Sequence, residues 1–446
     1  MIDFIKRKIH HLVLDKKFSE ILTGSAWTIS AHVLAIGLGI VANVIIARIY
    51  GAEVLGIMAV LNSFLMLITI FAILGTDASI LRLIPEHLVK YSPTSAFKVY
   101  RKTQYMVIGL SLFTSTVFFF GSDLIADKIF SKPHLSFYFG LVAVFVVFKS
   151  LRLLNTQAVR GLKLIKIFAF MQLLPQGANL ILLIVLGLFF YNKDIPVYAF
   201  LANFVVTGTI GWAIMEYSFK CKMRSDDQVM DMSAKTILTI SMPMLMTAMM
   251  TFAIGQTGVI MLSIFRSEAE VGYYAIAVKL ATLTSLLLSA INSMAAPKFS
   301  ELYHSNKIDE LFYIAKKSAK LIFFTSSPIL LVLLIFGKSI LGILFGHNFS
   351  VAYFALALIT IGQFVNSISG STGFFMNMTG NQNALIAIMI FATSINVGLN
   401  LYLIPSIGIN GAAVAGMVSI CFWNIAALLY IKKKFGKTIA YLPFAR

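Results

Sequence analysis

The chain has 446 residues, of which 59% are hydrophobic and only 12% are charged. This composition, with a mean hydropathy of +0.88, excludes a soluble protein with a polar surface and indicates an integral membrane protein. The formal net charge of +18 would also suit a nucleic-acid-binding protein, but the basic residues are spread over the ends of apolar segments, where they meet anionic lipid. We therefore expect membrane lipids, and no nucleic acid, among the partners.

Residues 1–23 are charged and mildly amphipathic, and they lack the short apolar region with a small-residue cleavage site that marks a signal peptide. They predict a helix that lies on the cytoplasmic face of the membrane. Apolar segments of roughly the 20 residues that span a bilayer then follow along the chain. These twelve segments are 24–46, 55–76, 103–121, 137–154, 167–190, 196–217, 236–262, 272–294, 318–336, 351–375, 384–404 and 411–431. The predicted fold class is an all-α integral membrane protein with about twelve transmembrane helices.

The distribution of Lys and Arg between these segments predicts the orientation of the chain. If the N-terminus is cytoplasmic, the cytoplasmic segments hold 29 of the 36 basic residues and the segments on the opposite side hold six. Lys279 is the remaining one, and it is the only basic residue that we expect deep inside a span. We therefore predict that both termini are cytoplasmic.

The second half of the sequence repeats features of the first half at an offset of 216 residues, which aligns Gly56 with Gly272 and Ala59 with Ala275. We interpret this repeat as two six-helix lobes in parallel orientation, a recurrent plan in transporters. Chance similarity between apolar segments is the alternative. The predicted organisation is a cytoplasmic interfacial segment at 1–23, an N-terminal lobe at 24–217, a cytoplasmic inter-lobe loop at 218–235, a C-terminal lobe at 236–431 and a basic cytoplasmic tail at 432–446.

Polar side chains recur at helical spacing in the first two spans of each lobe. Such a stripe has to face protein or water, so helix packing through small residues is the alternative to a cavity. Lys279 favours a water-filled cavity, because a lysine at the centre of a membrane helix costs about 2.5–3.5 kcal/mol on insertion scales and no intramembrane carboxylate lies near it in sequence. The candidate substrate-binding residues are Lys279, Arg48, Thr282, Ser289, Asn292, His32, Asn43, Asn62 and Thr251.

Asp77, Arg82 and Pro175 are candidates for coupling or gating. Asp77 and Arg82, at the inner end of the second span, are predicted to anchor the helix at the interface rather than to relay protons. Pro175 predicts a kink in the fifth span, which is either static or part of a moving element. The sequence has no motif of a hydrolase, a metalloprotease or a phosphate-binding loop, so we expect no enzymatic activity, no metal and no cofactor.

The stretch "IARIYGAEVLGIMAV", followed by "LGTDASILRLIPEH", resembles the polysaccharide transporter family of the multidrug/oligosaccharidyl-lipid/polysaccharide flippase superfamily. Its Ala-Arg-x-x-Gly-x-x-x-x-Gly pattern is matched at Ala47, Arg48, Gly51 and Gly56, and the Gly-x-Asp and Arg that often end its second helix are matched at Gly75, Asp77 and Arg82. The later stretch "EVGYYAIAVKL" is similar to the start of the family's eighth helix. The resemblance covers the whole chain in length, span number and half repeat.

This resemblance implies a MATE-like fold and a flippase in the plasma membrane of a bacterium or archaeon. Its substrate would be an undecaprenyl-diphosphate-linked oligosaccharide, the repeat unit of a surface polysaccharide such as O-antigen or lipopolysaccharide, moved to the outer leaflet by alternating access. Lys279 and, more weakly, Arg48 would pair with the diphosphate. A polysaccharide polymerase and the chain-length machinery would be further partners.

Three alternatives to this function remain at the level of the sequence. A drug or organic-cation antiporter comes first, although a lobe with buried carboxylates is not evident. A lipid II flippase is less favoured because the basic N-terminal pattern of those proteins is not evident. A membrane-embedded polysaccharide polymerase or ligase is less favoured because the predicted outer loops are short.

Overall fold

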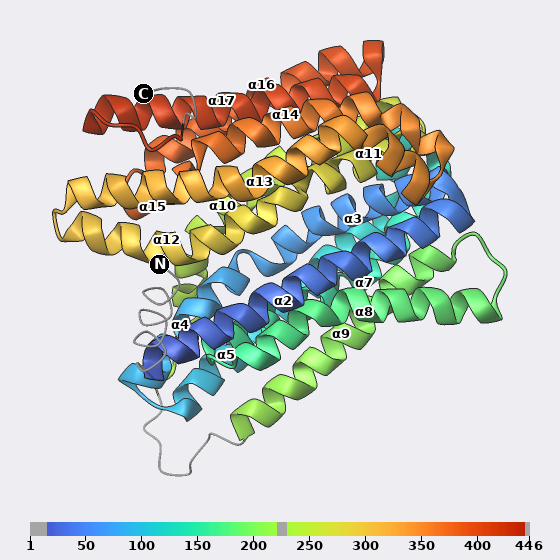
Figure 1. Cartoon of the computed structure of the whole chain (residues 1–446). Coiled ribbons are helices and arrows are strands. Elements are labelled where there is room, and N and C mark those ends of the chain that lie inside the picture. The colour runs from blue at the N-terminus through green and yellow to red at the C-terminus, as the bar shows by residue number, and fades with distance from the viewer. Residues whose placement is uncertain (1–15, 221–229, 442–446) are drawn as a thin grey trace. The chain divides into compact units, whose positions relative to one another are not determined.

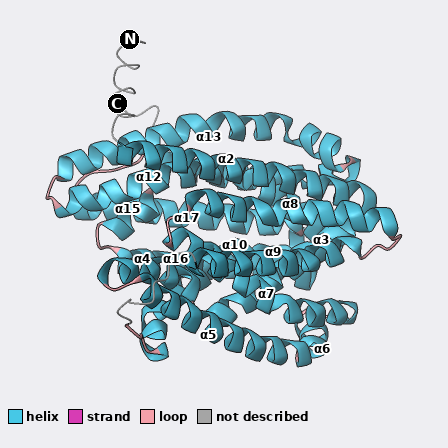
Figure 2. Cartoon of the chain, turned by 90° about the horizontal axis from the view of Figure 1, so that it is seen from below, coloured by secondary structure: helices cyan, strands magenta, loops and turns pink. Residues whose placement is uncertain are grey.

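The structure is a computed structural model that describes residues 16–220 and 230–441. Within these ranges every regular element is a helix (Figure 2), which confirms the predicted fold class. The α-helices are α2 (Lys16–Ile45), α3 (Gly51–Ile73), α4 (Thr76–Lys90), α5 (Pro93–Phe120), α6 (Ser122–Leu124), α7 (Ser136–Gly161), α8 (Ile165–Phe189), α9 (Ile195–Lys220), α10 (Ala234–Phe265), α11 (Glu268–Ala281), α12 (Ser285–His304), α13 (Ile308–Phe345), α14 (Tyr353–Ser369), α15 (Thr372–Met378), α16 (Gln382–Ile407) and α17 (Ile409–Phe435).

Among the described residues, ten segments are long and apolar enough to cross a membrane. One of them, Ser30–Ile73, has 44 residues, and a straight helix of that length would measure about 66 Å, roughly twice the thickness of a bilayer core. A π-helical turn at Ile46–Tyr50 and the positive φ of +90° at Gly51 divide it into α2 and α3. Because glycine adopts this backbone conformation without strain, the chain turns here. This one segment therefore covers most of two predicted spans, 24–46 and 55–76.

The predicted span at 272–294 is absent from these ten segments because it is not one continuous helix. α11 ends at Ala281, a 3-10 turn covers Thr282–Thr284, and α12 begins at Ser285. The hydroxyl groups of Thr282 and Ser285 donate hydrogen bonds to backbone carbonyls within the same stretch. Such bonds compete with the regular helical ladder. The structure thus has a broken helix where the sequence predicted a straight one.

The N-terminal interfacial helix predicted at 1–23 falls largely on residues 1–15, which lie outside the described residues. The rest of that segment, from Lys16, already belongs to α2. Part of the predicted inter-lobe loop, 221–229, and the last residues of the predicted tail, 442–446, also lie outside the described residues.

By their internal contacts the helices form two compact units. Unit 1 takes the described residues up to Asn43, together with Leu67–Asp123 and Ser136–Met246, and unit 2 takes the segments that remain. The borders divide α3 and α10 within their length, whereas the lobes predicted from the sequence meet in the loop at 218–235. The predicted lobe borders stay a prediction.

The core of unit 1 lies between α4, α5, α7 and α9. Tyr100 of α5 and Phe219 of α9 are fully buried and stack with their ring centroids 5.5 Å apart. Buried aliphatic residues of α4 and α7 complete the cluster, among them Ile80, Leu83 and Leu154. Burial of these side chains on one face of each helix is what holds the unit together.

The core of unit 2 is aromatic at one end. Phe312 of α13 lies 5.3 Å from Phe375 of α15 and 5.7 Å from Phe435 of α17, measured between ring centroids in edge-on geometry. Phe299 of α12 joins the same cluster. α14, α16 and α17 run side by side beyond it (Figure 1).

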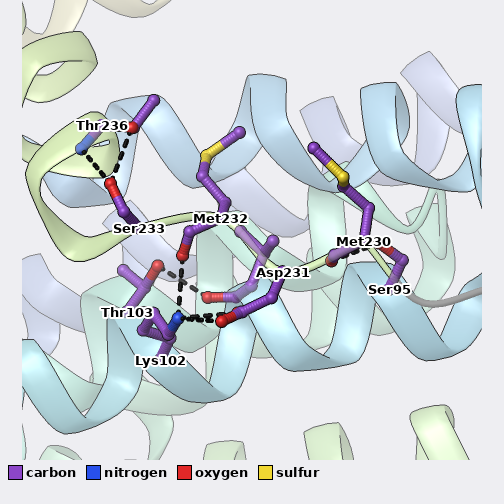
Figure 3. Close-up of polar contacts among 9 residues, drawn as sticks. Ser95, Lys102, Thr103, Met230, Asp231, Met232, Ser233 and Thr236 are labelled. Atoms are coloured by element: carbon purple, nitrogen blue, oxygen red, sulfur yellow. Dashed lines mark hydrogen bonds and ion pairs between the residues drawn. The ribbon is translucent and has the colours of Figure 1, made fainter.

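The segment before α10 is fastened to α5 within unit 1 (Figure 3). The Lys102 ammonium lies 2.6 Å from one Asp231 carboxylate oxygen and donates to the carbonyl of Met232 at 2.9 Å. Ser95 donates to the carbonyl of Met230, and the hydroxyl of Ser233 accepts the amide of Thr236 at the start of α10. The hydrogen bond from Lys102 holds the pKa of Asp231 below its ordinary value. The contacts fix where α10 begins.

Candidate functional site

Lys279 lies in the last turn of α11, three residues before the 3-10 turn that breaks the predicted span. Its side chain is exposed, while the residues that follow it on the helix, Leu280 and Ala281, are buried. The Thr282 hydroxyl donates to the carbonyl of Val278 at 2.8 Å and to that of Lys279 at 3.2 Å. The lysine therefore stands at a helix break lined by hydroxyl groups and not on a featureless apolar face.

Further predicted site residues of unit 2 fall on α3, α10 and α12. Asn292 is 4% exposed, and its side-chain oxygen is buried without a hydrogen-bond donor among the described residues. Asn62 donates a weak hydrogen bond to the Met66 sulfur at 3.8 Å, and Thr251 is exposed on α10. Ser289 belongs to α12, but its side chain lies outside the described set. Whether these residues share a cavity with Lys279 stays a prediction.

Arg48 is engaged with the end of α13. Its guanidinium donates to the carbonyl of Leu344 at 2.9 Å and also to that of Ile343, two carbonyls of the last helical turn. A cation at a helix C-terminus satisfies carbonyls that have no partner within the helix and complements the helix dipole. This gives Arg48 a structural contact that the sequence did not suggest, and its pairing with a substrate diphosphate stays a prediction.

His32 and Asn43 belong to α2 in unit 1. His32 is exposed, and Asn43 is partly buried, with a side-chain nitrogen that has no acceptor among the described residues. The structure thus assigns these two candidates to a different unit from Lys279. Their role in binding a substrate stays a prediction.

Asp77 and Arg82 both lie on α4, but they do not pair with each other. The Arg82 guanidinium lies 3.8 Å from the Glu86 carboxylate, one turn further along the helix. Burial raises the pKa of Asp77 above its ordinary value, and the backbone amide of Ala78 opposes this. Ser79 holds the start of α4 against α10 through a 2.7 Å hydrogen bond to Ser241. Asp77 is therefore a carboxyl group whose charged form is disfavoured.

Pro175 lies in the interior of α8, which continues across it from Ile165 to Phe189. The side-chain oxygens of Gln172 and Asn179, on either side of the proline, are buried without a donor among the described residues. Proline removes one backbone donor from the helix. Pro175 thus lies between two buried amide oxygens that lack a donor among the described residues. Its role in gating stays a prediction.

Gly56 of α3 and Gly272 of α11 meet where these two helices cross in unit 2. A Cβ atom added to Gly56 would overlap the carbonyl of Glu268, and one added to Gly272 would overlap the carbonyl of Ala52. The pairs are reciprocal, because at the offset of 216 residues Ala52 aligns with Glu268 just as Gly56 aligns with Gly272. Reciprocal contacts are what a two-fold relation between the two segments predicts.

A polar cluster binds the segment 124–135, which contains a π-helical and a 3-10 turn, to the start of α11, also in unit 2. The Lys132 ammonium lies 3.0 Å from the Glu268 carboxylate, with both side chains largely buried, and donates to the carbonyl of Arg266 at 2.8 Å. His134 lies 3.1 Å from the same carboxylate. Burial alone would raise the pKa of Glu268, but backbone and Lys132 hydrogen bonds hold it below the ordinary value.

One pair of cations in unit 1 was not predicted from the sequence. Lys149 and Arg152 were counted with the cytoplasmic segment that follows the fourth span, but α7 continues to Gly161, and Lys149 is only 6% exposed. The earlier expectation that Lys279 is the only basic residue deep inside a span is therefore wrong. Lys149 and Arg152 both lie within the candidate membrane span Pro133–Gly161, and α7 packs against α4, α5 and α9. The spacing of Lys149, Arg152 and Asn155 on one helix face was the available signal.

No group of three or more His, Cys, Asp or Glu side chains that could hold a metal ion occurs among residues 16–220 and 230–441. The candidate substrate-binding residues described above carry hydroxyls, amides, an imidazole and two cations. They can offer hydrogen bonds and positive charge to a bound molecule.

The fold is that of known membrane transporters. A multidrug resistance transporter of the MATE family and MOP superfamily, in an inward-facing conformation, superposes with a TM-score of 0.69 at 16% identity, over 92% of this chain and 94% of that one. The lipid II flippase MurJ, in an inward closed conformation, superposes with a TM-score of 0.71 at 15% identity, over 92% and 87%. The chain is a multi-pass membrane protein with the fold of this superfamily.

Within this class, a family model described as polysaccharide biosynthesis protein matches residues 45–353, and the chain belongs to that family. Two curated relatives come from Haloferax volcanii. The probable low-salt glycan biosynthesis flippase Agl15 is 24% identical over 51% of this chain and 47% of its own length. The probable flippase AglR is 27% identical over 39% of this chain and 37% of its own length. The matches thus span half or less of each relative.

Proposed function

We propose that this chain is a flippase that carries an undecaprenyl-diphosphate-linked oligosaccharide across the membrane by alternating access. The observation that supports it best is the position of Lys279, a residue with an exposed side chain at the helix break of an apolar segment. A diphosphate needs cationic partners, and charge-assisted hydrogen bonds are strong where water is excluded. The hydroxyl of Thr282 and the amides of Asn62 and Asn292 are groups of the kind that sugars bind.

The comparisons support the same class of substrate. The family is one of polysaccharide biosynthesis, and both curated relatives are named as probable flippases, one of them in glycan biosynthesis. A lipid-linked oligosaccharide is an intermediate that such pathways have to move across a membrane. We place the chain in the plasma membrane with both termini in the cytoplasm, and we expect a polysaccharide polymerase and chain-length proteins to use the product.

A reconstitution experiment tests the proposal. The purified full-length chain is inserted into lipid vesicles that carry undecaprenyl-diphosphate-linked oligosaccharide with a labelled sugar in both leaflets. A membrane-impermeant glycosidase added outside then digests the accessible sugar. Vesicles with the protein should lose the labelled sugar of both leaflets, whereas empty vesicles should lose only that of the outer leaflet.

The same vesicles distinguish the main alternative. An antiporter would release a trapped organic cation when a proton or sodium gradient is applied, and it would leave the inner-leaflet oligosaccharide protected. That pair of results would overturn the flippase proposal.

A further inference from the structure

Two cationic side chains converge inside unit 1. Lys149 and Arg152 are three residues apart on α7, so they share a helix face. The Lys149 ammonium lies 5.7 Å from the centroid of the Phe204 ring on α9, and the Arg152 guanidinium carbon lies 5.8 Å from the same centroid. Two like charges thus face one aromatic ring between α7 and α9.

Neither charge is compensated by an acid in the described part of the chain. No carboxylate lies within ion-pair distance of Lys149 or Arg152 there, and the Glu216 carboxylate of α9 pairs with Arg101 at 2.5 Å. The Arg152 Nε atom is buried without a hydrogen-bond partner among the same residues. The face of an aromatic ring attracts a cation but does not neutralise it, and buried charges are ordinarily paired.

The neighbouring groups leave a surplus of hydrogen-bond donors. Asn155, one turn beyond Arg152, is fully buried, and its oxygen accepts the Tyr100 hydroxyl at 2.8 Å. Its side-chain nitrogen has no acceptor among the described residues. The Asn203 oxygen is a buried acceptor without a donor there, but one neutral oxygen does not balance two cations. The contact between α7 and α9 around Phe204 is therefore suited to a negatively charged acceptor.

The packing of the two helices limits the size of that acceptor. Gly208 of α9 lies one turn after Phe204, and a Cβ atom added to it would come within 2.9 Å of the Phe148 carbonyl oxygen of α7. The two backbones approach each other closely at this point, directly beside Lys149. A sugar or a lipid head group does not fit between backbones so close, so the acceptor has to be small.

We propose that Lys149 and Arg152 bind a small inorganic anion of the size of chloride between α7 and α9, at a site separate from Lys279. The anion compensates the buried charge and joins the two helices. This site does not depend on the transported substrate, so its test is independent of the flippase assay.

The experiment measures chloride binding to the purified full-length chain in detergent. Thermal unfolding is followed while chloride replaces gluconate at constant ionic strength, and radioactive chloride binding is measured by equilibrium dialysis. A ligand that binds only the folded state raises the unfolding temperature with its concentration. The wild type should show a saturable rise and about one bound chloride per chain. Lys149→Met and Arg152→Gln should each weaken chloride binding at least tenfold.

Two controls make the result specific. Lys166→Met removes an exposed lysine at the start of α8 and should leave chloride binding unchanged. Lys149→Arg keeps the charge and should retain binding within about threefold, so it reports on the site even if Lys149→Met folds poorly. Equal unfolding temperatures of the wild type in chloride and gluconate, without saturable binding, would overturn the proposal. Lys149 and Arg152 would then be solvated by water. Unchanged binding in both Lys149→Met and Arg152→Gln would overturn it as well.

Discussion

At the scale of single residues, three basic side chains in apolar helices find three different surroundings. Arg48 binds the last carbonyls of α13, Lys149 is buried against the Phe204 ring, and Lys279 is exposed at a helix break. A buried cation costs several kcal/mol after relaxation, while a desolvated contact with an aromatic ring returns about 2 kcal/mol. Of the three, Arg48 and Lys279 are exposed, and Lys279 is the one that stands beside hydroxyl groups of its own helix break.

Asp77 gives a prediction with a defined pH dependence. Its pKa is raised by burial, so the folded state disfavours the carboxylate, and that destabilisation is present at neutral pH and disappears as the pH falls below the ordinary pKa of an aspartate. Asp77→Asn should therefore raise the unfolding temperature at pH 7, with a smaller gain at pH 4. The Asp77→Asn variant should still transport substrate, because we expect Asp77 to anchor the helix at the interface and not to relay protons.

The control for Asp77 is Asp309→Asn, at an exposed carboxyl group of α13 that pairs with Lys437. This variant should show no gain in unfolding temperature at pH 7. Loss of transport by Asp77→Asn at a normal membrane level would contradict the anchor and make Asp77 a coupling residue.

At the scale of helices, the crossing of α3 and α11 depends on two glycines without side chains. In Gly56→Ala a methyl group overlaps the backbone of α11, and the helices have to separate, which should cost about 3 kcal/mol or more. Gly272→Ala should cost a similar amount because its contacts are reciprocal. Thermal unfolding of the purified variants measures both.

Gly109 supplies the matched control. This residue of α5 has nothing within 4 Å of an added Cβ atom, so Gly109→Ala should stabilise the helix by about 0.5–1 kcal/mol. Equal unfolding temperatures for Gly56→Ala and Gly109→Ala would show that the crossing tolerates a side chain and that the close approach is not needed.

The sequence predicted the helices better than their ends and breaks. Apolar length alone identifies most spans, because a membrane helix has to be apolar over about 20 residues. The break at Thr282–Thr284 was not predictable from length, since it depends on hydroxyl groups competing for backbone carbonyls. The burial of Lys149 depends on contacts of α7 with other helices, and the length of an apolar segment does not predict these contacts.

The candidate site was only partly accessible to sequence reasoning. Lys279 was identified because a charged residue within a long apolar segment is visible in the sequence alone. The Arg48 guanidinium contacts the end of α13, almost 300 positions away in the chain. No pattern in the sequence indicated this contact. The contact between Gly56 and Gly272 had a visible signal in the repeat, although the repeat predicts equivalence and not contact.

At the scale of the whole molecule, the distribution of basic residues predicts a single orientation in the membrane. Reporter domains fused after basic inner loops should all be cytoplasmic, because such loops are retained on that side. The fusion sites are Lys102, Lys166, Lys235, Lys320 and Lys437. A periplasmic signal at any two of these sites would contradict the count of twelve spans and the two-lobe organisation.

The central claim, that Lys279 receives the diphosphate of a lipid-linked oligosaccharide, is tested most directly by flipping rates of Lys279 variants in the vesicle assay. Loss of one charge-assisted contact is worth about 1.5–3 kcal/mol, or about 10- to 150-fold. Lys279→Ala should slow flipping by that factor, Lys279→Arg should retain part of it, and Lys279→Glu should abolish it. The control Lys338→Ala, at an exposed lysine of α13, should flip at the wild-type rate. Wild-type flipping by Lys279→Ala would contradict the account.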